Sequence, residues 1–200
     1  TTSIFENTCK ERNSNLIYAS PKNNYASDLK GEYQKENINT VIEAIKQLQK
    51  IEWVITEDNI RNGLLKTVAN TKLLGRWQSL SKNPQIICDT AHNEDGIKEI
   101  AKQLRNSKYK QLHIVFGTVD DKDLDTILPY LPKDAKYYFC SANVLRAMNT
   151  ENIKQKADKY KLKGQKFASV SEALKCAKED AHQDDLIFIG GSTFVVAEVI

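Results

Sequence analysis

Apolar and polar positions follow two different periods along most of the chain. From residue 83 onward, short apolar runs typical of buried strands are separated by segments in which apolar residues recur every three or four positions, as in an amphipathic helix. Strands are expected at 85–89, 112–117, 137–141, 165–169 and 186–190, and helices at 95–104, 123–131, 150–160, 171–181 and 192–200. This alternation predicts right-handed βαβ units and an α/β fold with a mostly parallel sheet flanked by helices.

The first 70 residues show another pattern. Helical spacing is expected at 3–12, 35–50 and 56–68, with one short strand at 16–19 and polar turn residues at 21–28. A unit of this size buries too small a fraction of its surface to be stable alone. We therefore expect residues 1–70 to be the truncated tail of a larger domain and residues 71–200 to form a second domain, with a hinge at 69–74.

Composition places the chain among ordinary globular proteins. Hydrophobic residues make up 40% and charged residues 28% of its 200 residues, and no apolar run approaches the length of about 20 residues that spans a membrane. The net charge is only +3, with basic and acidic residues interleaved, so neither nucleic acid nor a membrane is expected as a partner. The four cysteines and three histidines are scattered, which predicts no metal site and favours a reducing, cytoplasmic location.

The chemically most informative stretch surrounds the apolar run at 86–88. Gly75-Arg76-Trp77-Gln78 precedes this run, and Asp89-Thr90-Ala91-His92-Asn93-Glu94-Asp95-Gly96 follows it. A guanidinium, a carboxylate, an imidazole and an amide are thereby gathered around the ends of one predicted strand. Ligands of open α/β sheets bind at the carboxyl ends of the strands, so the spacing predicts a binding site.

Each of these side chains has a structural role to weigh against a functional one. The carboxylate of Asp89 could accept two hydroxyl hydrogen bonds from a ribose, or cap the following helix. Arg76 has a planar fork of donors that suits a nucleotide, although a surface position in an edge strand is the ordinary alternative. His92 lies beside a carboxylate at a strand end, which favours a site role. Asn37 and Ser192 each stand at a predicted helix start, where both residue types are common caps.

Six motifs in this order resemble the folylpolyglutamate synthase/dihydrofolate synthase family, within the Mur ligase group of ATP-dependent amide ligases. They are Asp28-Leu29-Lys30-Gly31-Glu32-Tyr33-Gln34-Lys35-Glu36-Asn37, Gly75-Arg76-Trp77-Gln78, Asp89 to Gly96, Phe116-Gly117 with Asp121-Lys122-Asp123, Arg146-Ala147 and Gly191-Ser192. The resemblance implies a P-loop ATPase domain followed by a C-terminal Rossmann-like ligase domain. This chain would hold the end of the first and nearly all of the second.

The resemblance also implies a reaction and its substrates. ATP phosphorylates a carboxylate of folate or dihydropteroate, and the amine of L-glutamate then attacks the acyl phosphate to form an amide. In the family, the position of His92 lies near the reacting centre and the incoming glutamate, so His92 is expected to be catalytic and to contact substrate. The position of Ser192 lies near the glutamate pocket, and we expect substrate binding there.

Nucleotide contacts are implied in the same way. Arg76 and Asp89 occupy positions of ATP contacts, and Asn37 occupies the position of a contact to adenine, with Gln34 as a second candidate. The P-loop pattern Gly-x-x-x-x-Gly-Lys-Ser/Thr is absent from the chain, so the groups that hold phosphate and Mg²⁺ are expected upstream. The missing N-terminal ATPase domain would pack on residues 1–70, and the isolated chain is expected to be inactive.

Two alternatives stay open. The chain could come from a peptidoglycan-type Mur ligase, although the Asp-x-x-His-Asn pattern favours the folate branch. It could also be a non-catalytic Rossmann-like nucleotide-binding module. The absent P-loop favours such a module, whereas the polar residues gathered at strand ends do not, because a scaffold has no need of them.

Overall fold

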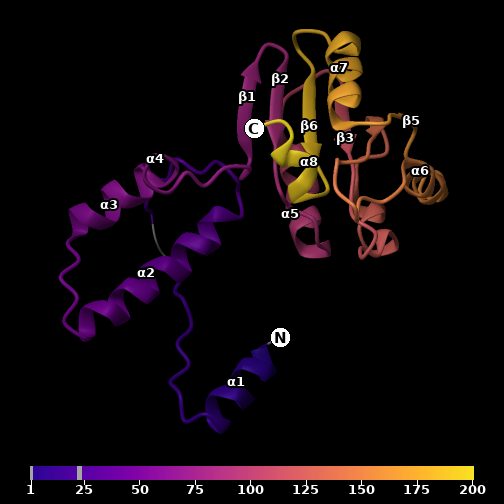
Figure 1. Ribbon diagram of the computed structural model, residues 1–200. Coiled ribbons are helices and arrows are strands. Elements are labelled where there is room, and N and C mark those ends of the chain that lie inside the picture. The colour runs from indigo at the N-terminus through magenta and orange to yellow at the C-terminus, as the bar shows by residue number, and fades with distance from the viewer. Residues whose placement is uncertain (1, 22–23) are drawn as a thin grey trace. The chain divides into compact units, whose positions relative to one another are not determined.

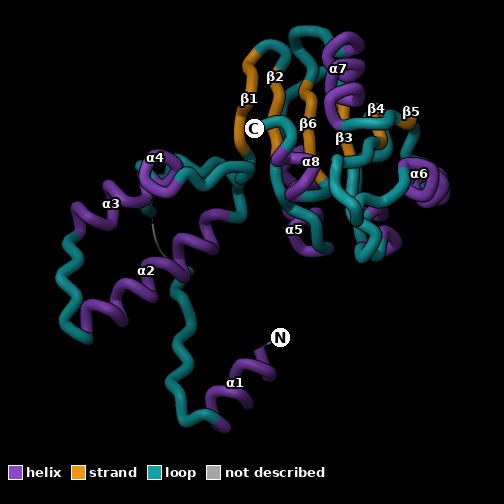
Figure 2. The backbone as a smooth tube through the Cα atoms, in the orientation of Figure 1, coloured by secondary structure: helices purple, strands orange, loops and turns teal. Residues whose placement is uncertain are grey.

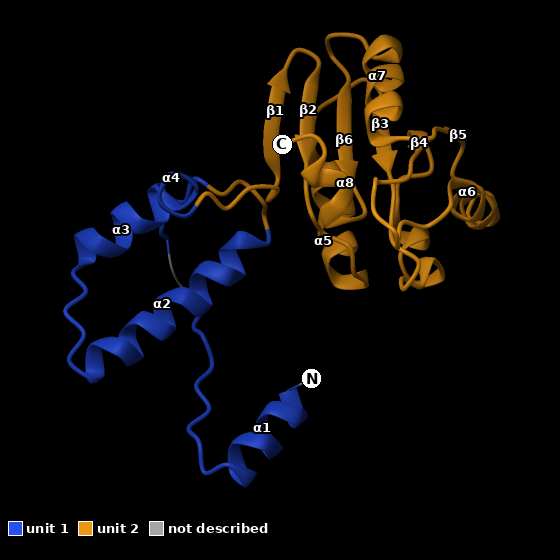
Figure 3. Cartoon of the chain, viewed as in Figure 1, with its two compact units in different colours: residues 1–28, 33–71 blue, residues 29–32, 72–200 orange. Residues whose placement is uncertain are grey.

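The chain forms two compact units. A computed structural model describes residues 2–21 and 24–200 (Figure 1). One unit comprises Thr1–Asp28 and Tyr33–Thr71, and the other comprises Leu29–Glu32 and Lys72–Ile200 (Figure 3). The short excursion of residues 29–32 into the second unit was not predicted from the sequence. That residues 1–70 are the tail of an ATPase domain stays a prediction.

The described part of the first unit contains helices joined by loops. Its helices are α1 (Thr2–Glu11), α2 (Gln34–Lys50), α3 (Glu57–Leu65) and α4 (Thr67–Thr71). The strand predicted at 16–19 is wrong, because these residues form no ladder and run as a loop. The predicted turn at 21–28 is also loop where it is described, and Lys22 and Asn23 lie outside the described residues.

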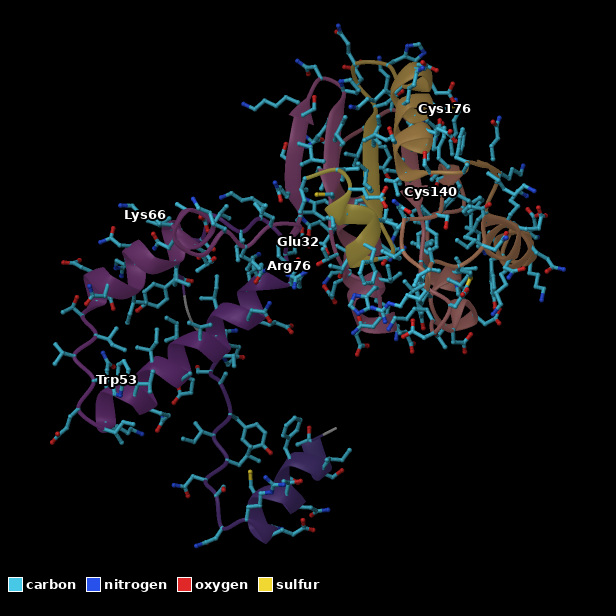
Figure 4. All side chains as sticks on the ribbon, in the orientation of Figure 1. Glu32, Trp53, Lys66, Arg76, Cys140 and Cys176 are labelled. Carbon is cyan, nitrogen blue, oxygen red and sulfur yellow. The ribbon has the colours of Figure 1, made fainter. Side chains whose placement is uncertain are left out.

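The first unit has a small core. Ile38 and Ile42 of α2 are buried against Ile60 of α3, and Thr56 begins α3 with a capping box in which its side chain accepts from the backbone N–H of Asn59. Many apolar side chains outside this core are exposed, among them Ile4, Phe5, Tyr18, Ile51, Trp53, Val54 and Leu65. Figure 4 labels Trp53 on the loop after α2. Apolar surface of this extent is typical of an interaction site.

The second unit is built on a six-stranded sheet in the order β1-β2-β6-β3-β4-β5 (Figure 2). The strands are β1 (Gln78–Lys82), β2 (Gln85–Cys88), β3 (Leu112–Phe116), β4 (Lys136–Phe139), β5 (Gly164–Lys166) and β6 (Leu186–Gly190). All neighbours are parallel except β1, which pairs with β2 in an antiparallel hairpin. The predicted α/β fold with a mostly parallel sheet is confirmed.

Helices cover this sheet. They are α5 (Glu94–Asn106), α6 (Thr150–Lys159), α7 (Val170–Asp180) and α8 (Thr193–Ala197), with the 3₁₀ turns η1 (Leu124–Thr126) and η2 (Leu128–Tyr130). Buried residues of α7 and α8 pack on alternate residues of the strands, such as Ile187 and Ile189 of β6. Because successive side chains of a strand point to opposite faces, these residues define one covered face of the sheet. None of the helices in the described parts of the chain is both long and apolar enough to cross a membrane.

Other elements also differ from the sequence prediction. The helix expected at 123–131 forms two 3₁₀ turns, because Pro129 has no N–H to continue an α-helix. The helix expected at 56–68 ends at Leu65 and restarts as α4. Strand β1 was missed because it is a polar edge strand in which only Leu80 is apolar.

A buried polar cluster ties β3, β4, α7 and the start of β6 together. The Nδ1 of His113 lies 2.8 Å from the hydroxyl of Tyr138, which donates to Asp180 at 2.7 Å, and Nε2 of His113 lies 3.4 Å from Asp185. Burial lowers the pKa of His113, and the nearby Asp185 offsets this only in part. Burial likewise raises the pKa of Tyr138. His113 and Asp185 of this cluster lie at the amino ends of β3 and β6, away from the predicted site, so we assign the cluster a structural role.

This assignment predicts unequal effects for two tyrosines that both bind an aspartate. Tyr138→Phe removes the hydroxyl that links His113 to Asp180 inside the protein, and leaves both without that partner; we expect a loss of about 1–3 kcal/mol in the free energy of unfolding. Tyr160→Phe removes an exposed hydrogen bond to Asp125 and should cost about 0.5 kcal/mol or less. Urea unfolding of both variants measures the difference, and equal losses would contradict a structural cluster.

Candidate functional site

The polar loops that follow β2, β3, β4 and β6 all lie at the carboxyl edge of the sheet, because these strands are parallel. A glycine permits the close approach of two of these loops, the one after β3 and the one after β6. Gly191 has φ +92°, and a Cβ atom there would lie 2.5 Å from a ring carbon of Phe116 and 2.7 Å from the carbonyl oxygen of Gly117. No other residue type fits this position without displacing its neighbours. Ser192 is thereby held beside the loop that follows β3.

The carboxylate of Asp89 organises the loop that precedes β1. It is only 1% exposed, and it accepts hydrogen bonds from the backbone N–H of Trp77 at 2.7 Å and of Ala91 at 2.9 Å. The N–H of Thr90 donates to the carbonyl of Gly75 at 2.9 Å. These bonds join the two halves of the motif that was predicted from the sequence, across the antiparallel β1–β2 hairpin.

Arg76 projects from this organised loop. Its neighbours Gly75 and Trp77 both have positive φ, at +70° and +47°, and the buried Trp77 ring lies 6.0 Å from that of Phe188. Arg76, labelled in Figure 4, is half-buried. Its guanidinium makes no hydrogen bond or ion pair with any residue that the structure describes. A fixed backbone with an unengaged guanidinium is well suited to bind an anionic or hydrogen-bonding ligand.

The imidazole of His92 has a defined tautomer. Its Nδ1 lies 2.9 Å from the carbonyl oxygen of Thr90, and because a carbonyl can only accept, Nδ1 carries a hydrogen. In the neutral ring Nε2 is then left with a lone pair, on the side of the ring away from this contact. The side chain can therefore accept a proton or a hydrogen bond at a stated atom.

A hollow of about 300 Å³ brings residues of four loops together. It is lined by His92 after β2, by Val119, Asp121 and Lys122 after β3, by Arg146 after β4, and by Ser192, Thr193 and Phe194 after β6. Its volume is at the lower end of the range for small-molecule sites. The structure thus unites His92 and Ser192, both predicted substrate contacts, in one concave surface.

Backbone bonds hold the walls of this hollow. Val119 and Ala147 form an isolated antiparallel bridge, and the N–H of Asp120 donates to the carbonyl of Arg146 at 2.9 Å. The Arg146 guanidinium lies 4.8 Å from the centre of the Phe194 ring, a cation–π contact that limits the freedom of its long side chain. The loops after β3, β4 and β6 therefore form one connected wall.

The charges around the hollow are mixed. Lys122 and Arg146 are cationic, Asp121 is anionic, and His92 can add a further positive charge when it is protonated. This set complements a small ligand that carries two carboxylates and one ammonium group. The sequence motifs include Lys122 and Arg146, but no ligand role was predicted for either. The feature that could have indicated one is their position in loops that follow predicted strands, at the same sheet edge as His92.

The other predicted site residues are placed as follows. Ser192 is 3% exposed and caps α8, since its hydroxyl accepts from the N–H of Phe194 at 3.2 Å. Asn37 lies on α2 of the first unit, where its side-chain amide donates to Gln34 at 2.9 Å. A crevice shared by Asn37, Arg76 and the turn after Asp89 therefore stays a prediction. The ligand roles of Arg76, Asp89, His92 and Ser192 stay predictions as well.

A metal site does not form among the side chains that the structure describes. In residues 2–21 and 24–200 no three His, Cys, Asp or Glu side chains are grouped as ligands for a cation. The buried thiols of Cys88 and Cys140 are unsuited to metal binding or nucleophilic chemistry, because burial raises the pKa of each to about 12. The described side chains form no ligand set that fits Mg²⁺. We therefore assign no chemical step in this chain to that ion.

Comparison with known proteins identifies the family of this fold and site. The family model described as "Mur ligase, glutamate ligase domain" matches residues 75–193. A probable bifunctional folylpolyglutamate synthase/dihydropteroate synthase of Haloferax volcanii is 30% identical over 173 residues, which cover 85% of this chain and 20% of that protein. A dihydrofolate synthase/folylpolyglutamate synthase of Escherichia coli is 28% identical over 148 residues, covering 73% of this chain and 33% of that protein.

A solved structure agrees with the sequence matches. The structure of Escherichia coli FolC in complex with DHPP and ADP has a TM-score of 0.74 and 26% identity, over 89% of this chain and 40% of that one. This chain thus spans a fifth to two fifths of the length of the relatives it matches. From the matched family model and these relatives, we conclude that the chain belongs to the Mur ligase family, in its folylpolyglutamate synthase/dihydrofolate synthase group.

Proposed function

We propose that the full-length protein is an ATP-dependent ligase that adds L-glutamate to a folate or to dihydropteroate. The observation that carries this proposal is the charge pattern of the hollow at the carboxyl edge of the sheet. L-Glutamate bears two carboxylates and one ammonium group at neutral pH, the complement of Lys122, Arg146 and Asp121. Relatives with folate substrates favour this activity over that of a peptidoglycan-type Mur ligase.

Each charged residue of the hollow has a proposed partner on glutamate. Lys122 and Arg146 bind the two carboxylates, and Asp121 binds the ammonium group before reaction. Phe194 restrains the Arg146 side chain, so that less freedom is lost when the guanidinium engages a carboxylate. Ser192, which lines the hollow, caps the start of α8 and is proposed to offer its hydroxyl to the amino acid.

His92 is proposed to act on the amine. An ammonium group must lose a proton before it can attack a carbonyl carbon, and the Nε2 lone pair of neutral His92 can accept that proton. The nitrogen then forms the amide bond with the acyl carbon, and the carbon–oxygen bond to the phosphate breaks. Holding the amine close to this carbon converts an encounter of two molecules into a step within one complex.

Three residues of this chain are proposed as nucleotide contacts. Arg76 offers its guanidinium to the nucleotide, and Asn37 offers donor and acceptor to the edge of adenine. Asp89, whose carboxylate accepts two backbone hydrogen bonds, is proposed to contact the ribose hydroxyls. The FolC relative was solved with ADP, which supports nucleotide binding in this group.

The remaining parts of the enzyme are proposed to lie outside this chain. A P-loop and the ligands of Mg²⁺ would neutralise charge at the transferred phosphoryl group. The domain that carries them would cover exposed apolar side chains of the first unit, such as Phe5 and Tyr18. The 200-residue chain alone is therefore proposed to be inactive. ADP release from this chain that depends on folate and glutamate would contradict that statement.

Substitutions in the hollow test the glutamate assignment in the full-length enzyme. Lys122→Ala or Arg146→Ala removes a charge-assisted bond to a carboxylate, and should raise the KM for glutamate roughly tenfold or more while the KM for ATP changes little. Lys159→Ala, which removes an exposed lysine at the end of α6, is the matched control. Steady-state kinetics with each substrate varied in turn measure both constants. An unchanged KM for glutamate in both variants would refute the assignment.

A second prediction concerns the carboxylate that positions Arg76. Asp89→Asn places an amide NH₂ next to a backbone N–H, so the loop of Gly75 to Trp77 should loosen at a cost of about 1–3 kcal/mol in local stability. Trypsin should then cleave after Arg76 faster than in the unaltered chain, as followed by mass spectrometry of the fragments. Asp95→Asn, in the exposed first turn of α5, serves as the control. Equal cleavage rates in the two variants would show that Asp89 does not organise this loop.

A further inference from the structure

The helix α8 contacts the loop that follows β4 at two points. A carboxylate oxygen of Glu198, at the end of α8, accepts a hydrogen bond from the backbone N–H of Asn143 at 2.6 Å. Four residues earlier, the ring of Phe194 lies under the guanidinium of Arg146, 4.8 Å from the ring centre. Residues four apart lie on the same face of a helix, so one face of α8 holds residues 143–146 at both ends.

The segment 143–146, the tip of this loop, has little apolar packing of its own. Asn143, Leu145 and Arg146 are exposed, and Val144 is partly buried against the core. The carbonyl of Arg146 accepts from the N–H of Asp120 at 2.9 Å, which fixes the end of the tip beside the loop after β3. At the start of the tip, the backbone is restrained by the bond to Glu198.

The chemistry of this bond suits a restraint. A hydrogen bond from an N–H to an ionised carboxylate is shorter and stronger than one to a neutral acceptor, and the bond from Asn143 is short. Water around the exposed Glu198 weakens it, so the effect of removing the carboxylate should be moderate. The restraint matters for Arg146, because a long side chain that is already placed loses less freedom when it binds a carboxylate.

We propose that Glu198 is a positioning residue for the amino acid that binds in the hollow. Glu198 does not line the hollow, so it acts through the loop and not by touching the ligand. Its carboxylate holds the backbone at Asn143, and together with Phe194 it keeps the Arg146 guanidinium at the wall of the hollow. This inference rests on the proposed function, because it takes Arg146 to bind a carboxylate of L-glutamate.

Restraint of the loop and simple charge predict opposite effects on binding. If Glu198 acted only by its charge, its removal would strengthen the attraction of the hollow for an anionic amino acid, and the KM for glutamate would fall. If Glu198 restrains the loop, its removal leaves Arg146 less well placed, and the KM rises. Glutamine has no charge but keeps a side-chain carbonyl that can accept from Asn143, so Glu198→Gln separates the two effects.

The test compares variants of the full-length protein. Glu198→Ala removes the acceptor without opening a cavity, because the side chain is exposed, and Glu198→Gln retains an acceptor. Glu179→Ala is the matched control, since this exposed glutamate of α7 lines the same surface depression as Glu198. Arg146→Ala is measured alone and in combination with Glu198→Ala. Amide hydrogen exchange followed by mass spectrometry and the KM values for ATP and glutamate are determined for each.

The expected result is local and confined to one substrate. In Glu198→Ala, amides of residues 141–147 should exchange faster while those of β3 keep their protection, and the KM for glutamate should rise roughly fivefold with an unchanged KM for ATP. Glu198→Gln should stay within about twofold of the unaltered enzyme, because the acceptor remains, and Glu179→Ala should match the unaltered enzyme. When Arg146 is already alanine, Glu198→Ala should cause no further rise.

Three results would overturn the inference. Unchanged exchange at 141–147 in Glu198→Ala would show that Glu198 does not hold the loop. An unchanged or lower KM for glutamate would show that the contact does not serve binding by restraint. A rise of the same size in the presence of Arg146→Ala would show that Glu198 does not act through Arg146. A full-length protein with no ligase activity would refute the proposed function instead, and the exchange measurement would still report whether Glu198 holds Asn143.

Discussion

The second unit depends on the way one buried carboxylate at the end of β2 is satisfied. Asp89 lies where water is excluded, and an unpaired charge there would be costly. The backbone N–H groups of Trp77 and Ala91 meet its two oxygens, and in doing so they fix the loop before β1 and the turn after β2. The positions of Arg76 and His92 follow from these two bonds. One electrostatic requirement of folding thus positions two groups of the candidate site.

Parallel strand order supplies the rest of the site. Because β2, β6, β3 and β4 are neighbours and point the same way, loops from distant parts of the sequence end at one edge. That edge receives Lys122, Arg146 and Ser192 in addition to His92. The cluster of His113 differs from this edge, because its polar groups form hydrogen bonds with one another and have few donors or acceptors left for a ligand. Cationic groups line the hollow, which we propose to bind a ligand, whereas the polar groups of the His113 cluster bond to one another inside the domain.

Periodicity along the chain was sufficient to predict most of the second unit, and its limits have physical causes. Buried parallel strands such as β3 and β6 are continuous apolar runs, so their existence and bounds were recognisable. Strand β1 was not, because an edge strand with one apolar residue has no such signature. The strand predicted at 16–19 was apolar but has no partner strand among the described residues, and apolar composition alone does not make a ladder. Ligand roles for Lys122 and Arg146 required the sheet order, which no local pattern contains.

The hollow at the carboxyl edge is proposed to recognise L-glutamate by its two carboxylates and its amine. The most direct measurement is a crystal structure of the full-length protein with ADP and L-glutamate bound. We expect glutamate carboxylates within hydrogen-bonding distance of Lys122 and Arg146, with the amine next to Nε2 of His92. Glutamate bound at another surface, or bound in the hollow with its carboxylates turned away from both cations, would contradict it.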